Sequence, residues 1–246
     1  MERNSDRPVI VTGGASGIGF AIVERLLAQG YPVGVFDLNC AGLQILGDNS
    51  SLHPFEVDIT EYDSVARVVG EFETATGPVY GLINNAGWDS AKLFIKTEID
   101  FWRKVIEINL YGPLNVTHLA LKRMAELERG RVISIASDAG RVGSSGEAVY
   151  SAAKGGVIAL MKTLAREHAR QDITFNSICP GPTDTPLFAA IDKTGRLNER
   201  LRRAIPKQRL GRPDDYPGLV AFFLSDDASF ITGQTISVSG GLTMSG

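Results

Sequence analysis

A strand, a glycine-rich loop and a helix follow one another without interruption near the start of the chain. Pro8–Thr12 is a short apolar run, and it passes directly into the loop Gly13–Gly19. Apolar side chains then recur at positions 21, 22, 26 and 27, the spacing of a helix with one buried face. This order directs backbone N–H groups and the positive end of a helix dipole at a phosphate, so it predicts a nucleotide-binding α/β fold. A turn that only permits close contact between helix and strand is the alternative.

Strand-like apolar runs alternate with helical patterns along the rest of the 246 residues. We expect strands at 33–37, 52–58, from 79, at 131–136, 173–179 and about 234–239, and helices at 60–75, about 98–127, 148–169 and 214–224. Such alternation predicts a doubly wound, Rossmann-like parallel sheet with helices on both faces and a ligand at the carboxyl ends of the strands. No linker divides the chain, so residues 1–246 are expected to form a single domain.

The composition excludes several classes of protein. A net charge of −3 argues against general nucleic-acid binding. No apolar run approaches the roughly 18 residues of a membrane span, and the first seven residues carry no apolar stretch of a signal peptide. Cys40 and Cys179 fit neither a metal site nor a disulfide pattern. We expect a soluble, cytoplasmic protein that binds no metal, membrane or nucleic acid.

The second expected strand ends on an acid, Asp37, 18 residues after Gly19. A carboxylate at this place accepts hydrogen bonds from both hydroxyls of an adenosine ribose and repels a 2′-phosphate. Neither Ser16 nor Leu38 supplies the cation that a 2′-phosphate needs. The pattern predicts NAD rather than NADP as the cofactor, with a simple helix cap as the alternative role of Asp37. Asp58, at the end of the third strand, is placed to meet the adenine amino group.

Tyr150 and Lys154 are four residues apart in a segment that continues as an amphipathic helix, so their side chains leave the same face. Because an ammonium group favours the phenolate, we expect the pKa of Tyr150 to be depressed. Ser137 ends a strand thirteen residues earlier and can hydrogen-bond the substrate oxygen that Tyr150 protonates or deprotonates. Asn109 lies among apolar neighbours within the helix expected at about 98–127, and it needs hydrogen-bond partners there. A local structural hydrogen bond is the alternative for Asn109.

Taken in order, these motifs resemble the short-chain dehydrogenase/reductase family over essentially the whole chain. They are Thr12–Gly19, Asn84–Gly87, Asn109, Ser137, Tyr150-x-x-x-Lys154 and Pro180–Gly181. The resemblance implies that Tyr150 is the general acid/base and that Ser137 polarises the substrate carbonyl or hydroxyl group. It also implies that Lys154 lowers the tyrosine pKa and grips the nicotinamide ribose, while Asn109 holds a water in a proton relay.

The motifs and the family resemblance together indicate a full set of cofactor-binding residues. These are Gly13, Ser16, Gly17, Ile18, Gly19, Asp37, Leu38, Asp58, Ile59, Asn85, Ala86, Gly87, Tyr150, Lys154, Pro180, Gly181, Thr183 and Thr185. The resemblance further implies a homotetramer, assembled through the helices at 98–127 and 148–169 and through the C-terminal segment.

Four stretches are similar to 2-hydroxycyclohexanecarboxyl-CoA dehydrogenases: 84–89, 136–150, 179–185 and 237–244. This narrower resemblance implies an NAD-dependent dehydrogenase that oxidises an alicyclic β-hydroxyacyl-CoA to its β-keto thioester. A 3-oxoacyl-carrier-protein reductase and a dehydrogenase of free cyclic alcohols or polyols are the alternatives of the same chemistry. A regulator or scaffold that binds the cofactor without turnover is the alternative from another class.

The segment 182–209 is polar, and family resemblance makes it a lid over the substrate. Its cations are Lys193, Arg196, Arg200, Arg202, Arg203, Lys207 and Arg209, and its acids are Asp184, Asp192 and Glu199. A positive field at the mouth of a pocket would favour the phosphates of CoA. A solvated helix face is the alternative.

Overall fold

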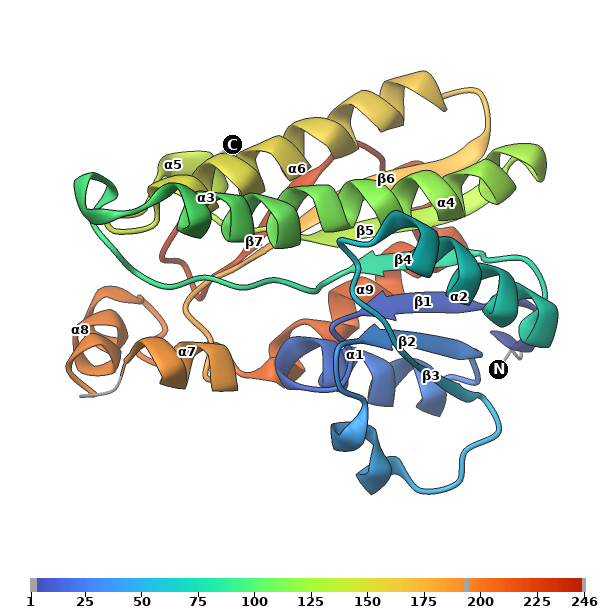
Figure 1. Cartoon of the computed structure of the whole chain (residues 1–246), viewed down its shortest axis with the longest axis horizontal. Coiled ribbons are helices and arrows are strands. Elements are labelled where there is room, and N and C mark those ends of the chain that lie inside the picture. The colour runs from blue at the N-terminus through green and yellow to red at the C-terminus, as the bar shows by residue number, and fades with distance from the viewer. Residues whose placement is uncertain (1–3, 193–194, 245–246) are drawn as a thin grey trace.

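Seven parallel strands form one sheet in the computed structural model, which describes residues 4–192 and 195–244 (Figure 1). The strands are β1 (Val9–Thr12), β2 (Val33–Asp37), β3 (Leu52–Glu56), β4 (Gly81–Asn84), β5 (Arg129–Ile135), β6 (Asp172–Pro180) and β7 (Thr235–Val238). Their order across the sheet is β3-β2-β1-β4-β5-β6-β7, and each neighbouring pair runs parallel. The order reverses between β1 and β4, which is where ligands bind in doubly wound sheets. The predicted fold class is confirmed.

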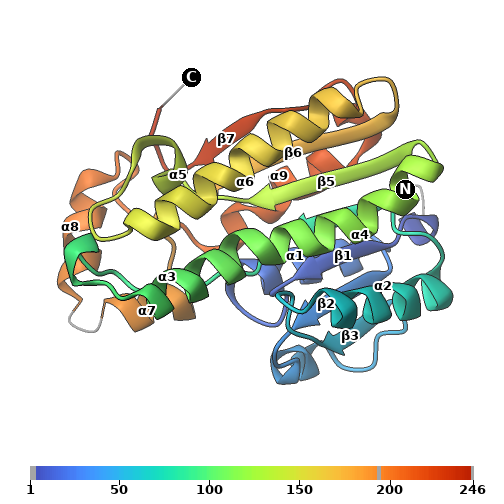
Figure 2. The same ribbon diagram turned by 45° about the horizontal axis from the view of Figure 1, so that its top comes forward.

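Helices cover both faces of the sheet. One apolar core joins α1 (Gly17–Ala28) and α9 (Pro217–Leu224) to one face. A second core joins α2 (Tyr62–Thr76), α4 (Gly112–Glu126) and α6 (Ala148–Glu167) to the other. Figure 2 shows these three helices side by side in front of the strands. Within the described residues, no helix combines the length and apolar character that crossing a membrane requires.

The helix expected at 98–127 contains an irregularity that the sequence pattern does not reveal. It consists of α3 (Ile99–Ile106), a π-helical turn at Glu107–Tyr111, and α4. Pro113 stands at the start of α4. In a regular helix, the ring of a proline clashes with the carbonyl four residues earlier, which here belongs to Asn109. The wider π turn relieves that crowding, and such turns are frequent at functional sites.

The polar segment that follows β6 is more regular than expected. It forms α7 (Pro186–Ile191) and α8 (Arg196–Ala204), at the end of the molecule toward which the strands point (Figure 1). Thr185 caps α7 by accepting the N–H of Phe188 at 3.2 Å. Asp192 lies before α8 and accepts the N–H groups of Leu197 and Asn198 at 3.3 and 2.7 Å. Lys193, one of the cations counted in this segment, lies outside the described residues.

Several expected boundaries also shift. β3 ends at Glu56, and α2 begins at Tyr62 rather than at 60. The carboxylate of Asp58 accepts the N–H of Thr60 at 2.9 Å and so bends the chain between these two elements. The last helix starts at Pro217 because a 3-10 turn, Pro213–Asp215, precedes it.

Candidate active site

The loop between β1 and α1 is shaped by glycines whose side-chain positions are already filled. A Cβ at Gly13, where φ is +62°, would lie 2.8 Å from the Cα of Ala86. A Cβ at Gly19 would lie 2.1 Å from the carbonyl oxygen of Gly13. Ser16, at the N-cap of α1, is exposed and makes no side-chain capping bond. The first N–H groups of α1 therefore remain available to an anion such as a cofactor phosphate.

Thr12 and Asn85 fasten this loop to the turn after β4. The Thr12 hydroxyl oxygen accepts the N–H groups of Asn85 and Ala86, both at 3.0 Å. The Asn85 amide in turn donates to the carbonyl oxygens of Thr12 and Gly13 at 3.0 and 2.9 Å. Asn85, predicted as a cofactor contact, thus uses its amide N–H groups to fix the loop.

The groups predicted for the adenosine end of the cofactor lie at the ends of β2 and β3. The two carboxylate oxygens of Asp37 accept the N–H of Ala15 at 3.0 Å and the N–H of Asn39 at 3.3 Å. Each carboxylate oxygen has a second lone pair, so both remain able to accept a ribose hydroxyl. Leu38 is 70% exposed and Ile59 is buried. These residues fit an adenosine between a carboxylate and an apolar surface.

Four groups predicted to act on the substrate and nicotinamide converge around Gly87. Lys154 is 4% exposed, and its amino group donates to the carbonyl oxygen of Ile135 at 3.0 Å. The same amino group lies 5.6 Å from the centre of the Tyr150 ring. A Cβ at Gly87 would lie 2.9 Å from Oδ1 of Asn109 and 3.5 Å from Nζ of Lys154.

Ser137 follows β5 and completes this group. Its hydroxyl accepts the N–H of Ala139 at 3.1 Å, in the first turn of α5 (Ala139–Val142). A hydrogen bond between Ser137 and Tyr150 is also among the influences on the tyrosine pKa. The serine, tyrosine and lysine predicted from the sequence therefore lie close to one another in the structure.

The expectation about the Tyr150 pKa is wrong for the protein chain alone. Burial raises the pKa of this phenol above its ordinary value of 10, and the carboxylates of Glu147 and Asp89 raise it further. Hydrogen bonding with Ser137 acts in the other direction. Burial also lowers the pKa of Lys154 to about 8. Desolvation thus outweighs the attraction between the two side chains, and Tyr150 is a protonated phenol at neutral pH.

Asn109 occupies the π turn and clamps the backbone of Trp88. Its amide donates to the carbonyl oxygen of Trp88 at 2.7 Å and to that of Val105 at 2.9 Å. Its Oδ1 accepts the N–H of Trp88 at 3.3 Å. These contacts match the structural alternative for this residue. The role in a proton relay stays a prediction, and it depends on the remaining lone pair of Oδ1 near Lys154.

The predicted residues after β6 serve different purposes. A Cβ at Gly181 would lie 2.8 Å from the Cα of Ser239, so the chain from Pro180 to Gly181 packs tightly against the C-terminal segment. The buried hydroxyl of Thr183 is hydrogen-bonded to the Tyr216 hydroxyl and donates to the carbonyl oxygen of Gly181. Thr185 lies beside the glycine loop, where its methyl group would be 3.5 Å from a Cβ at Gly17.

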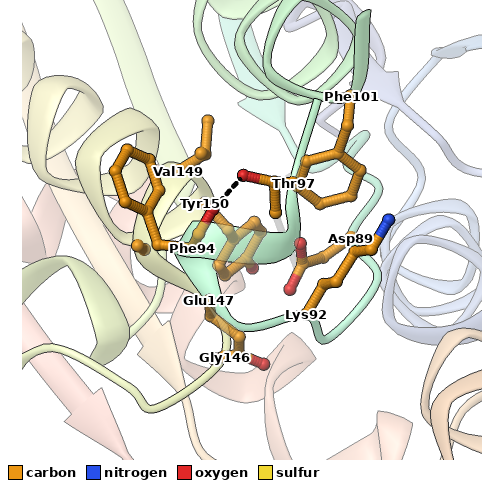
Figure 3. Close-up of a pocket in the computed structure, with 10 residues that line it drawn as sticks. Asp89, Lys92, Phe94, Thr97, Phe101, Gly146, Glu147, Val149 and Tyr150 are labelled. Atoms are coloured by element: carbon orange, nitrogen blue, oxygen red, sulfur yellow. Dashed lines mark hydrogen bonds between the residues drawn. The ribbon is translucent and has the colours of Figure 1, made fainter. Parts of the chain in front are cut away.

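Tyr150 forms part of the wall of a pocket (Figure 3). It is lined by Asp89, Lys92, Phe94, Thr97 and Phe101 and by the chain from Gly146 to Tyr150. The N–H of Lys92 donates to the carbonyl oxygen of Gly146 at 2.8 Å and ties the two walls together. Asp89 is not among the site residues predicted from the sequence. The only feature of the sequence that points to it is that this acidic residue stands two positions after the turn that follows β4.

Comparison with known proteins supports the assignment that the geometry suggests. A family described as Enoyl-(Acyl carrier protein) reductase matches residues 13–243. The chain belongs to the short-chain dehydrogenase/reductase family. It is 39% identical over 244 residues to an acetoacetyl-CoA reductase of Shinella zoogloeoides, covering 96% of this chain and 98% of the relative. It is 37% identical over 238 residues to the 3-oxoacyl-[acyl-carrier-protein] reductase MabA of Mycobacterium tuberculosis, covering 97% and 93%.

A solved short-chain dehydrogenase/reductase has nearly the same backbone. A variant of the actinorhodin polyketide ketoreductase, crystallised with NADPH, superposes with a TM-score of 0.92 at 32% identity, covering 97% of this chain and 98% of that one. As a member of this family, the chain is an oxidoreductase that acts on hydroxyl and keto groups with a nicotinamide cofactor. The named relatives favour the expected alternative, a reductase of β-keto thioesters, over the alicyclic dehydrogenase that the sequence stretches suggested first.

Proposed function

We propose that the protein interconverts β-ketoacyl and β-hydroxyacyl thioesters with NAD(H), and that ketone reduction is its favoured direction. The observation that carries this proposal is the cluster of Ser137, Tyr150 and Lys154 beside a pocket with aromatic walls. The curated relatives act on acetoacetyl-CoA and on 3-oxoacyl-carrier-protein substrates, as their names state, and they support the thioester as substrate class.

The residues divide the work on the substrate oxygen. The Ser137 hydroxyl donates a hydrogen bond to the ketone oxygen and aligns it with Tyr150. Tyr150 then gives its proton to the oxygen as the bond order falls, which is general acid catalysis. The phenol of Tyr150, whose pKa is raised by burial, carries the proton that ketone reduction requires. The bound nicotinamide supplies the hydride, and Lys154 is the residue that would hold its ribose.

The preference for NAD rests on Asp37. Its carboxylate stands at the end of β2, where a 2′-phosphate would have to lie, and like charges would repel there. Neither neighbouring loop position, Ser16 or Leu38, offers a compensating cation. The solved ketoreductase contains NADPH, so cofactor choice in this chain is argued from its own residues.

An alicyclic β-hydroxyacyl-CoA is the second candidate substrate. It is favoured by the stretches 84–89 and 136–150, which resemble 2-hydroxycyclohexanecarboxyl-CoA dehydrogenases and whose last residues, Asp89 and 146–150, line the pocket. We further propose a cytoplasmic homotetramer, with α7 and α8 as a lid over the substrate.

A substrate and cofactor panel tests this function. kcat/KM is measured with acetoacetyl-CoA, with 2-ketocyclohexanecarboxyl-CoA, with free acetoacetate and with cyclohexanone, each with NADH and NADPH. We expect the thioesters to be reduced at least about tenfold better than the free substrates, and NADH to be preferred. Asp37→Ser should narrow the cofactor preference, whereas the exposed acid change Asp48→Ser should leave it unchanged. A preference for NADPH in the unmodified enzyme contradicts the cofactor assignment, and turnover of free ketones alone contradicts the thioester.

A further inference from the structure

Asp89 follows a residue whose position is fixed from several sides. Both backbone polar groups of Trp88 are bonded to Asn109. The Trp88 ring packs edge-on against Phe101 with centroids 5.9 Å apart, and the Lys104 amino group lies 4.0 Å from its centre. Because the preceding residue is held at its backbone and its side chain, the Asp89 carboxyl group has a defined place in the site.

That carboxyl group is buried in the pocket wall beside Tyr150. Asp89 is 6% exposed, and its Oδ2 has no hydrogen-bond partner within the part of the chain that the structure describes. Figure 3 shows the carboxyl group among the lining side chains, on the side of the pocket opposite Phe94. A buried oxygen without a partner is costly, and in native proteins it calls for an explanation.

The surroundings of Asp89 raise its pKa, chiefly through burial. Burial raises the pKa of Asp89 to about 6, and the nearby Glu147 adds to the increase. A hydrogen bond with the N–H of Ser90 and the positive charge of Lys154 act against it. Lys92, on the same loop, is exposed. A substrate that covers the pocket removes more solvation from the carboxylate, and it therefore pushes Asp89 further toward the acid.

We propose that Asp89, as a carboxylic acid, donates a hydrogen bond to the thioester carbonyl oxygen of the substrate. The inference rests on the proposed function. A β-ketoacyl thioester carries two carbonyl oxygens separated by three carbons. Ser137 and Tyr150 engage the ketone oxygen, and Asp89 supplies the second donor in the pocket that Tyr150 lines. Phe94 and Phe101 in that pocket offer no hydrogen bond, and the Thr97 hydroxyl already donates to the carbonyl oxygen of Phe94 at 2.6 Å.

This arrangement also selects against free acids. A neutral thioester carbonyl accepts a hydrogen bond from protonated Asp89, whereas a free β-keto acid would bring a negative charge next to a buried carboxyl group. Above the pKa of Asp89, binding of the thioester takes up one proton from solvent. The protonated group acts only as a donor to the bound substrate, and Tyr150 remains the acid of the chemical step.

Two variants separate hydrogen bonding from charge. Asp89→Asn keeps a donor and does not titrate, whereas Asp89→Leu keeps the approximate volume and removes the donor. Substrates are acetoacetyl-N-acetylcysteamine, which has both carbonyls but no CoA phosphates, and the monoketone 2-pentanone. The exposed acid change Asp100→Asn in α3 serves as the control, and cofactor binding and the melting temperature verify that each variant is folded.

At about pH 6 we expect Asp89→Leu to lose 10- to 100-fold in kcat/KM for the thioester, with little change for the monoketone. Asp89→Asn should stay within about threefold of the unmodified enzyme. The ratio of unmodified enzyme to Asp89→Asn should fall as the pH rises from about 5.5 to 8, because only the unmodified pocket loses its donor by ionisation.

Three results would overturn the inference. Thioester turnover that neither variant changes removes Asp89 from substrate binding and leaves the proposed function intact. A ratio that rises with pH means that Asp89 acts as an anionic acceptor. Reduction of the monoketone without reduction of any thioester refutes the proposed function itself, and the role of Asp89 with it.

Discussion

At the residue scale, Tyr150 and Lys154 illustrate how burial controls the chemistry of the site. Tyr150→Phe removes the transferable proton while keeping the ring that packs near Lys154. We expect kcat to fall about 10²- to 10⁴-fold, with cofactor affinity nearly unchanged, because only the acid is lost. Steady-state kinetics and a fluorescence titration of NADH measure the two effects. Tyr111→Phe, on an exposed tyrosine, is the control. More than about a tenth of the original turnover in Tyr150→Phe would exclude the assigned role.

Lys154 should make stability depend on pH in a recognisable way. Its pKa is about 8 in the folded protein against 10.5 ordinarily, a difference that corresponds to roughly 3 kcal/mol. Below pH 8 the lysine is protonated in both states, and the full cost of burying its charge opposes folding. Between about 8 and 10.5 only the unfolded chain holds the proton, so this cost declines as the pH rises.

The melting temperature of Lys154→Met relative to the unmodified protein should therefore decrease between about pH 8 and 9.5. A change of 1 kcal/mol corresponds to roughly 2–4 °C for a chain of this size. The variant also loses the hydrogen bond to Ile135, but this loss changes the difference in melting temperature by a similar amount at every pH. The change of that difference with pH therefore reports only the titration of Lys154. Lys162→Met, on the exposed side of the same helix, should show no such trend. A constant difference for Lys154→Met contradicts the lowered pKa.

A site residue could be predicted from the sequence when residues close to it in the chain determine its surroundings. Tyr150 and Lys154 share one helix face, and their spacing indicates them when it is read together with Ser137 and the motifs on either side. Thr183 depends on Tyr216, which lies 33 positions away, and no local pattern reveals that its hydroxyl is buried. Asp89 likewise gains its unusual environment only when α3 and the segment before α6 close over it.

At the element scale, α5 and α6 approach each other through glycines. A Cβ at Gly140 would lie 2.6 Å from the backbone nitrogen of Gly155 and 2.7 Å from the carbonyl carbon of Lys154. Gly140→Ala must push the two helices apart. We expect the free energy of unfolding to fall by about 1–3 kcal/mol and kcat to fall as well, because Ser137 moves relative to Tyr150.

Gly70, in α2, is the matched control. A Cβ there meets no neighbour within 4 Å, and Gly70→Ala should stabilise the protein by about 0.5–1 kcal/mol. The melting temperature and kcat of both variants test these expectations. If neither quantity changes in Gly140→Ala, the two helices are not packed as closely as the structure indicates.

The charges of α8 give a separate prediction for the lid. Arg196, Arg200 and Arg202 are exposed, whereas Arg209 is bound to Asp215 by two hydrogen bonds of 2.6 and 2.7 Å. If the α8 arginines attract CoA, KM for acetoacetyl-CoA should rise with salt and with Arg200→Gln/Arg202→Gln. KM for acetoacetyl-N-acetylcysteamine should respond to neither. Equal responses of the two substrates would leave these arginines as a solvated surface.

The regular elements could be predicted from the sequence because buried parallel strands are apolar runs and the helices between them are periodic. The π turn could not, since the apolar pattern continues through it and only the position of Pro113 hints at crowding. The helices α7 and α8 of the proposed lid were missed because both are short and neither has a fully buried side chain. Thr185 and Asp192, whose side chains accept the first N–H groups of α7 and α8, were the available signal.

At the scale of the whole molecule, apolar groups remain on the outside of the single chain. Phe230 is fully exposed, Met244 near the C-terminus is 83% exposed, and Ile99 and Tyr111 are 59% and 56% exposed. Burial of such surfaces between subunits supports the proposed homotetramer. Light scattering at micromolar concentration should report about four times the 26.4 kDa of one chain. A monomer would contradict the proposal. The double variant Phe230→Ser/Met244→Ser should weaken assembly if these side chains lie in a subunit interface.

The π turn also fixes the rotational phase of a long helix. Each residue in an α-helix advances the direction of its side chain by about 100°, so one surplus residue sets the far half out of step with the near half. α4 can then turn its apolar side toward the sheet while α3 presents a different side to the pocket. Deleting one residue between Glu107 and Tyr111 would bring the two halves back into step and rotate one of them away from its neighbours. The number of residues in this helix is therefore constrained by the contacts of both halves. We expect substitutions here to be tolerated far better than the gain or loss of one residue.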